Sequence, residues 1–143
     1  MLSFARHLVL ALFLVLPLAA NAQENMRQTV LVLDGSGSMW GQIEGEAKIT
    51  SAQRAVGDLL DTMAEDSILG LIAYGHRRRG DCGDIEVLVE PAPGTRDEVA
   101  AAVNAISPRG KTPLGDSVRL AAEMLRYQEE PATVILLSDG LEN

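Results

Sequence analysis

Apolar residues follow two different patterns along the chain, and together the patterns predict alternating strands and helices. Residues 29–33, 68–75 and 133–140 contain continuous apolar runs, which are typical of strands covered on both faces. Residues 48–64 instead carry apolar side chains three or four positions apart. This spacing predicts a helix with one buried face, formed by Ile49, Ala52, Val56, Leu59, Leu60 and Met63.

The middle of the chain predicts a further strand and a further helix. Residues 84–90 follow the preceding strand after a loop too short to hold a helix, which favours an antiparallel neighbour. The sequence PAPG at 91–94 is expected to break the chain. Thr95 and Glu98 then have the spacing of a capping box, which predicts the start of a helix.

Another irregular segment separates this helix from the next one. Prolines and glycines in residues 107–115 predict a loop, and residues 114–126 predict a helix with Val118, Ala121, Ala122 and Leu125 on one face. The resulting order β-α-β-β-α-α-β predicts an α/β fold, with a mostly parallel sheet layered between helices. In such sheets, ligands bind beyond the carboxyl ends of the strands.

The first 22 residues have the layout of a secretory signal peptide. Arg6 precedes a short apolar run, and Ala20 and Ala22 flank Asn21 as in an A-x-A cleavage site. An uncleaved membrane anchor is the alternative, but the apolar stretch is shorter than the roughly 20 residues that span a bilayer. We therefore expect cleavage after Ala22, export to the periplasm or the extracellular space, and one domain over residues 23–143 without a transmembrane span.

The part of the chain that follows this leader is acidic. It has 11 Lys and Arg against 20 Asp and Glu, a formal charge of −9. This charge argues against nucleic acid and anionic membranes as partners, since both require clustered basic residues. The one basic run, His76 to Gly80, is interpreted as a solvated loop rather than as a phosphate site.

Hydroxyls and carboxylates gather at three positions where the predicted pattern changes from apolar to polar. The segment DGSGS ends the first strand with Asp34, Ser36 and Ser38. Thr112 lies in GKTPLG before the last helix, and Asp139 lies in SDG at the end of the last strand. Hard oxygen ligands of this kind suit Mg²⁺, Mn²⁺ or Ca²⁺ and, without His or Cys nearby, do not suit Zn²⁺ or Cu²⁺.

If the DGSGS segment is considered without the other two, simpler interpretations are possible. DGSGS could be an ordinary strand-to-helix turn with serine N-caps. A dinucleotide-binding glycine loop fails because Trp40 stands at the third glycine position of G-x-G-x-x-G. An aspartyl-phosphate phosphotransferase would need a second acid where Ser36 stands, and no serine-hydrolase elbow ends a strand here.

Taken together, the three segments resemble the metal-ion-dependent adhesion site of the von Willebrand factor type A family. The resemblance spans residues 28 to 143 and implies a Rossmann-like three-layer fold, with residues 84–90 as one antiparallel edge strand. It implies that Ser36 and Ser38 bind the ion directly and that Thr112 binds it directly or through water. Asp34 and Asp139 would act mainly through water, and a partner's Glu or Asp would complete the coordination.

The same resemblance bears on the end of the chain and on two single residues. Family members continue for two more strand–helix units, so the domain is expected to be incomplete at its carboxyl end. Cys82 is the only cysteine, and its disulfide partner is expected beyond Asn143, with a buried or free thiol as the alternative. Trp40 is expected either near the ion-binding face or buried under the following helix.

Three hypotheses about function follow. The first is a non-enzymatic module that binds a carboxylate of a protein partner through a divalent cation. The second is a metal-assisted hydrolase, for which Glu44, Glu46 and His76 are the candidate bases. The third is a structural subunit with a vestigial ion site. The sequence does not specify the oligomeric state.

Overall fold

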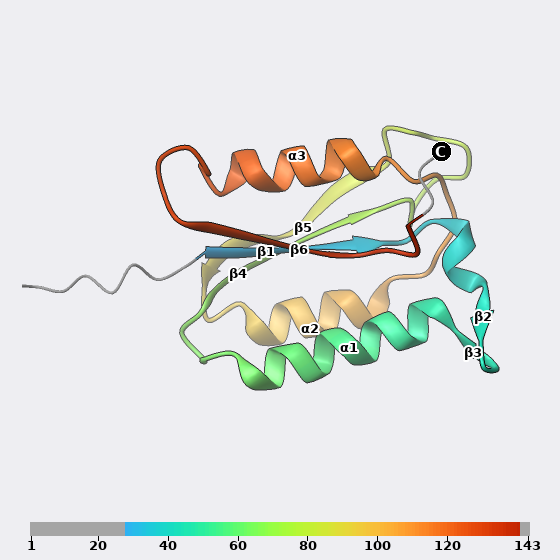
Figure 1. Ribbon diagram of the computed structural model, residues 1–143, viewed down its shortest axis with the longest axis horizontal. Coiled ribbons are helices and arrows are strands. Elements are labelled where there is room, and N and C mark those ends of the chain that lie inside the picture. The colour runs from blue at the N-terminus through green and yellow to red at the C-terminus, as the bar shows by residue number, and fades with distance from the viewer. Residues whose placement is uncertain (1–27, 141–143) are drawn as a thin grey trace, which may run out of the picture.

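A computed structural model describes residues 28–140 of the chain (Figure 1). The predicted signal peptide and the predicted start of the domain at residue 23 lie outside the described residues. The elements follow the predicted order, with a short 3-10 helix and a small hairpin added after the first strand. They are β1 (Gln28–Asp34), η1 (Gly37–Trp40), β2 (Gln42–Ile43), β3 (Glu46–Ala47), α1 (Lys48–Thr62), β4 (Ile68–Tyr74), β5 (Ile85–Pro93), α2 (Arg96–Ala105), α3 (Leu114–Met124) and β6 (Ala132–Leu137).

Four strands form one sheet in the order β5-β4-β1-β6. β1 pairs in parallel with both β4 and β6, whereas β5 pairs antiparallel with β4. The mostly parallel sheet and its one antiparallel edge strand are therefore confirmed. The register aligns Asp34 with Tyr74 and Leu33 with Leu137, so the carboxyl ends of β1, β4 and β6 meet at one edge.

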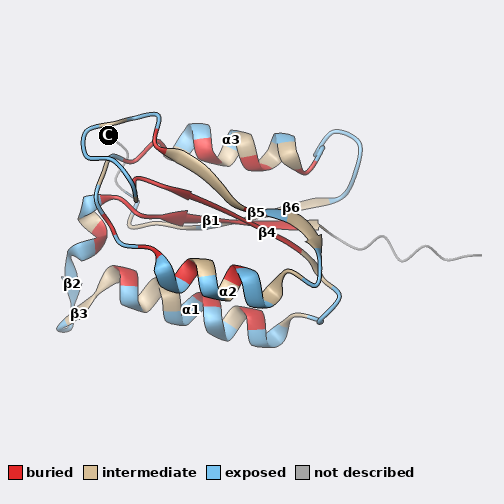
Figure 2. Ribbon diagram, turned by 180° about the vertical axis from the view of Figure 1, so that it is seen from behind, coloured by how far each residue is buried: buried red, intermediate tan, exposed pale blue. Residues whose placement is uncertain are grey.

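Helices cover both faces of the sheet, which gives three layers (Figure 1). α1 and α2 pack on one face and α3 on the other, and the central strands are the most buried part of the molecule (Figure 2). The side chains of β1 alternate between the two cores. Leu31 and Leu33 pack towards α1 and α2, whereas Val30 and Val32 pack towards α3.

The PAPG segment does not break the chain where the sequence predicts it. β5 continues through Pro91 to Pro93, and the register shifts between Leu69 and Leu71 opposite these residues. β5 is an edge strand, so a proline nitrogen there can face away from the sheet without removing a ladder hydrogen bond. The prediction of a break at residue 91 is therefore wrong.

The start of α2 is also held differently from the capping box that the sequence predicts. Thr95 stands at the N-cap position, but its side chain makes no capping hydrogen bond. Its hydroxyl lies 2.6 Å from the carbonyl oxygen of Leu69 and 2.9 Å from that of Ala92. Because its hydroxyl donates a hydrogen bond to these carbonyl oxygens, Thr95 links the start of α2 to β4 and β5 instead of capping the helix.

The helices of the described residues pack on a sheet, and their length and composition differ from those of transmembrane helices. Among residues 28–140, no helix has the length and apolar character that crossing a bilayer requires. The longest, α1, has 15 residues and buries only Ile49, Val56 and Leu60 fully.

Candidate functional site

The three polar segments singled out in the sequence meet at the carboxyl edge of the sheet. Ser36 and Gly110 form a β-bridge, and the amide of Gly37 donates a hydrogen bond to the carbonyl oxygen of Gly110 at 3.0 Å. The hydroxyl of Ser138 donates to Asp34 at 2.8 Å. Segments 34–38, 107–113 and 138–139 are thus joined by direct hydrogen bonds.

Asp34 lies at the centre of this junction and has no exposed surface. Its Oδ1 atom accepts a hydrogen bond from the amide of Ser36 at 2.8 Å, and its Oδ2 atom accepts the one from Ser138. A buried carboxylate is stable only when its oxygen atoms are hydrogen-bonded or paired with positive charge. The two bonds orient Asp34 and leave each oxygen with lone pairs for a further ligand.

The two predicted serines bring their hydroxyl groups together. The Oγ atoms of Ser36 and Ser38 lie 3.0 Å apart, although their backbones belong to the strand end and to η1 respectively. Ser36 is buried and Ser38 is partly exposed. Thr112 is fully buried, two residues after the glycine that bridges to Ser36. These three hydroxyl-bearing residues therefore lie on adjoining segments beside Asp34.

The second carboxylate, Asp139, contacts a positive charge from a distant part of the chain. Its Oδ2 atom lies 2.9 Å from the Nζ atom of Lys48, the first residue of α1. Only 5% of the Asp139 side chain is exposed, against 26% of the Lys48 side chain. The ammonium group of Lys48 therefore offsets part of the negative charge that Asp34 and Asp139 bring to this edge.

Tyr74, at the end of β4, contributes a buried hydroxyl without a partner. Its OH group has no hydrogen-bond partner within residues 28–140 and is shielded from solvent. Burial raises the pKa of Tyr74, and although the neighbouring Ser138 hydroxyl lowers it, the carboxylates of Asp34 and Asp139 raise it further. The phenol is thus neutral and lies close to both carboxylates. Buried hydroxyls without a partner are rare in folded proteins.

The side chains at this edge fit a hard divalent cation by their chemistry. Within residues 28–140, no group of three or more His, Cys, Asp or Glu side chains is arranged to hold a metal ion. The candidate site instead combines two carboxylates with hydroxyl oxygen atoms, a set that suits Mg²⁺ or Ca²⁺ and not Zn²⁺. The unpartnered Tyr74 hydroxyl is consistent with a further polar group, such as an ion-bound water, in the same place.

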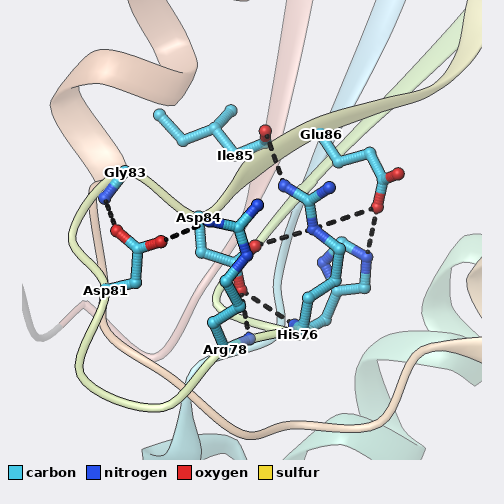
Figure 3. A network of polar contacts seen from close by, with 8 residues as sticks. His76, Arg78, Asp81, Gly83, Asp84, Ile85 and Glu86 are labelled. Carbon is cyan, nitrogen blue, oxygen red and sulfur yellow. Dashed lines mark hydrogen bonds and ion pairs between the residues drawn. The ribbon is translucent and has the colours of Figure 1, made fainter.

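The basic loop of residues 76–83 is exposed but tied to the sheet by one buried carboxylate (Figure 3). Asp84 has no exposed surface and accepts hydrogen bonds from the amides of Arg77 and Arg78, at 2.8 and 2.9 Å. The guanidinium of Arg77 donates a third bond to Asp84 at 2.7 Å. Asp84 therefore gives this predicted solvated loop a defined shape beside the candidate site.

The same contacts shift the titration of Asp84. Burial alone would raise the pKa of this carboxyl group, but the amides of Arg78 and Arg77 and the Arg77 guanidinium outweigh burial and lower it. Because the folded-state pKa lies below the unfolded value, these contacts stabilise the fold above about pH 4, and the effect is lost as the pH falls through the folded-state pKa.

We expect carbon-13 NMR to show the Asp84 carboxyl group titrating below about pH 3.9, the ordinary value for aspartate. Arg77→Gln removes one of its partners and should move the midpoint upward. A midpoint at or above the ordinary value in the parent protein would contradict the predicted direction.

Trp40 and Cys82 are both at the surface. Trp40 is 55% exposed, so the expectation that it is buried under the following helix is wrong. Its indole Nε1 atom donates a hydrogen bond to the carbonyl oxygen of Pro108 at 2.9 Å, which holds the ring next to the 107–113 loop. Cys82 is an exposed free thiol within the described residues, which rules out the buried alternative.

Sequence reasoning missed three residues of this site, Ser138, Tyr74 and Lys48. Ser138 precedes Asp139 in the SDG segment, and Tyr74 is the polar residue near the end of the predicted apolar strand 68–75, so both carried a local signal. Lys48 carried none, because its contact with Asp139 joins residues 91 positions apart.

Residues 29–142 match the family model described as von Willebrand factor type A domain. The layered sheet and the polar strand ends agree with this match, and the chain belongs to the von Willebrand factor type A family. No curated protein sequence matches the chain.

Several solved structures share the fold. The von Willebrand factor domain of the type V pili tip protein Mfa5 from Porphyromonas gingivalis is 24% identical, with a TM-score of 0.58, and the match covers 80% of this chain and 38% of that one. The conserved hypothetical protein BatB from Bacteroides thetaiotaomicron is 22% identical, with a TM-score of 0.61 and coverage of 76% and 51%. The PilB minor pilin from Streptococcus sanguinis, solved as a mutant, is 19% identical, with a TM-score of 0.60 and coverage of 81% and 30%. This chain thus spans about half or less of each matched chain.

Proposed function

We propose that this chain is a binding module that holds one divalent cation through Asp34, Ser36, Ser38, Thr112 and Asp139. The ion, Mg²⁺ or alternatively Mn²⁺ or Ca²⁺, supplies a Lewis acid that accepts a carboxylate oxygen of a protein partner. The proposed activity is therefore adhesion or protein interaction and not turnover.

One observation carries this assignment. The hydroxyl oxygen atoms of Ser36 and Ser38 lie 3.0 Å apart, next to the buried carboxylate of Asp34. Two neutral oxygens this close, at the edge where the strands end, suit two positions in the coordination shell of a hard cation.

Two of the three candidate bases of the hydrolase hypothesis are held by other side chains. Glu46 is bound by the guanidinium of Arg54 and the hydroxyl of Ser51, and these bonds lower its pKa to about 2. A carboxylate with so low a pKa is a weak base at neutral pH. His76 contacts Glu86 through Nε2 at 2.9 Å, and Glu44 is exposed on the turn between β2 and β3. These contacts favour the binding module over the hydrolase.

The proposed location is the periplasm or the cell surface. It rests on the predicted signal peptide and on the similarity in fold to a pilus tip protein and to a minor pilin. An exported module that binds carboxylates through an ion fits a role in contact with another protein of the cell envelope or its surroundings.

The carboxylate requirement is tested with two short Gly/Ser peptides that carry one central Glu or one central Gln. Amide NMR shifts of the protein are followed during titration in Mg²⁺ and in EDTA. We expect the Glu peptide to bind in Mg²⁺ at least tenfold more tightly than the Gln peptide, because only the carboxylate can bind the ion. EDTA should abolish the difference. Equal binding of both peptides, or binding that EDTA leaves unchanged, would refute the proposal.

A further inference from the structure

Within residues 28–140, the basic residues without an ion pair lie on two neighbouring loops. Residues 28–140 contain ten Lys and Arg residues, and seven of these form ion pairs (Lys48, Arg54, Arg77, Arg78, Arg96, Arg119 and Arg126). The other three, Arg79, Arg109 and Lys111, are exposed and make no ion pair within that range. We call these three residues the basic rim.

The basic rim belongs to two loops that pack against each other at the edge of the candidate site. The amides of Arg109 and Gly110 both donate hydrogen bonds to the carbonyl oxygen of Gly75, at 3.1 and 2.6 Å. Arg109 and Lys111 flank Gly110, which bridges to Ser36. Arg79 follows Arg78, whose carbonyl oxygen would lie only 2.4 Å from a methyl group placed on Gly110. All three residues therefore lie on backbone segments that pack next to the segment carrying Ser36.

The acidic side chains that flank the basic rim in sequence are paired with cations outside the rim. Asp84 and Glu86 contact Arg77, Asp81 contacts Arg78, and Asp116 contacts Arg119. Residues 76–86 and 107–111 together carry five Lys and Arg against three Asp and Glu, which is an excess of positive charge on a chain whose formal net charge is −8. Such local complementarity guides the encounter with a ligand of opposite charge and limits which partners bind.

We propose that the basic rim binds further carboxylates of the same partner, so that the partner presents an acidic segment and not a single acidic residue. This inference rests on the proposed function, since the ion would hold one carboxylate and the rim its neighbours. A protein segment is favoured over a nucleic acid or a membrane because the rest of the molecule is acidic and would be repelled by an extended anionic surface.

The test compares two peptides on the full chain in Mg²⁺, one with a single Glu and one with four consecutive Glu in the same Gly/Ser frame. The rim variant carries Arg79→Gln, Arg109→Gln and Lys111→Gln. The control variant carries Arg54→Gln, Arg119→Gln and Arg126→Gln, which removes the same charge from exposed, ion-paired positions. Calorimetry at low and at high salt gives the affinities.

We expect the rim variant to bind the four-Glu peptide about tenfold more weakly at low salt, and the difference to shrink at high salt. Binding of the single-Glu peptide and of Mg²⁺ should change by less than about threefold. The control variant should bind both peptides as the parent protein does. An equal loss in the two variants, or a parent protein that binds the two peptides equally, would overturn the inference.

Two further measurements separate this inference from its alternatives. Phosphatidylglycerol vesicles that bind the parent protein but not the rim variant, without matching binding of the four-Glu peptide, would assign the rim to a membrane and overturn the inference. If the single-Glu peptide does not bind in Mg²⁺, the proposed function fails. In that case, binding of carboxylates by the basic rim is still supported if the four-Glu peptide binds in EDTA and the rim variant loses that binding. Any other result refutes it.

Discussion

Replacing Asp34 by alanine is expected to lower the affinity for Mg²⁺ at least a hundredfold. Asp34 brings one of the two negative charges of the site, and its Oδ1 atom holds the amide of Ser36 at 2.8 Å. A unit charge about 4 Å from another is worth about 4 kcal/mol at the effective dielectric near a protein surface, and a divalent ion gains more. That value exceeds the 2.8 kcal/mol that corresponds to about a hundredfold in affinity.

Calorimetric titration with Mg²⁺ measures this effect. Two serine variants, one inside the site and one outside it, serve as comparisons. Ser36→Ala keeps the backbone contact to Asp34 but removes one hydroxyl ligand, so we expect a smaller loss of about tenfold. Ser51→Ala is the matched control, because its hydroxyl bonds to Glu46 outside the site and should not affect the ion. Circular dichroism confirms that each variant is folded. Parental Mg²⁺ affinity in a folded Asp34→Ala protein would exclude the assigned ion site.

Alanine at Gly75 or Gly110 is expected to lower the free energy of unfolding by about 3 kcal/mol. A methyl group on Gly75 would lie 2.3 Å from the carbonyl oxygen of Lys111, and Gly75 also has a φ of +65°. A methyl group on Gly110 would meet the carbonyl oxygen of Arg78 at 2.4 Å. Both clashes involve backbone atoms, which cannot rotate away as a flexible side chain can.

Urea unfolding measures this loss, and Gly57→Ala provides the control. Gly57 lies within α1, and a methyl group there has no neighbour within 4 Å. Alanine at this position should stabilise the protein by about 0.5 to 1 kcal/mol, because glycine is unfavourable in a helix. Unchanged stability of Gly75→Ala and Gly110→Ala would mean that the two loops do not approach each other so closely.

The elements were predictable from sequence where one local pattern decides the structure. The apolar runs that form β1 and β4, and the helical spacing that forms α1, depend on burial alone. The break expected at Pro91 failed because an edge strand tolerates proline, and whether a strand lies at an edge depends on the whole sheet. The capping-box prediction was wrong because the Thr95 hydroxyl donates a hydrogen bond to the carbonyl oxygen of Leu69, 26 residues away in sequence.

The candidate site, like the helices and strands, was predictable only where a local sequence pattern indicates it. Asp34, Ser36 and Ser38 are neighbours in sequence and Asp139 follows an apolar run, so strand-end reasoning was enough to predict them as candidate site residues. The contact between Lys48 and Asp139, and the hydrogen bonds that Asp84 accepts from the basic loop, depend on how the segments pack in three dimensions. Local spacing therefore predicted the oxygen-bearing residues of the candidate site, and only the three-dimensional arrangement showed the charges around them.

The position of Trp40 makes the protein its own spectroscopic reporter. Trp40 is the only tryptophan in the chain, so the intrinsic fluorescence excited at its absorption edge comes from a single place. Trp40 is the last residue of η1, two positions after Ser38. Its indole donates a hydrogen bond to the carbonyl oxygen of Pro108, in the loop that leads to Thr112. Emission wavelength and quenching thus record the contact between these two segments without any attached dye. The half-exposed ring is open to iodide and to acrylamide, so its accessibility can be followed while ion and peptide are added.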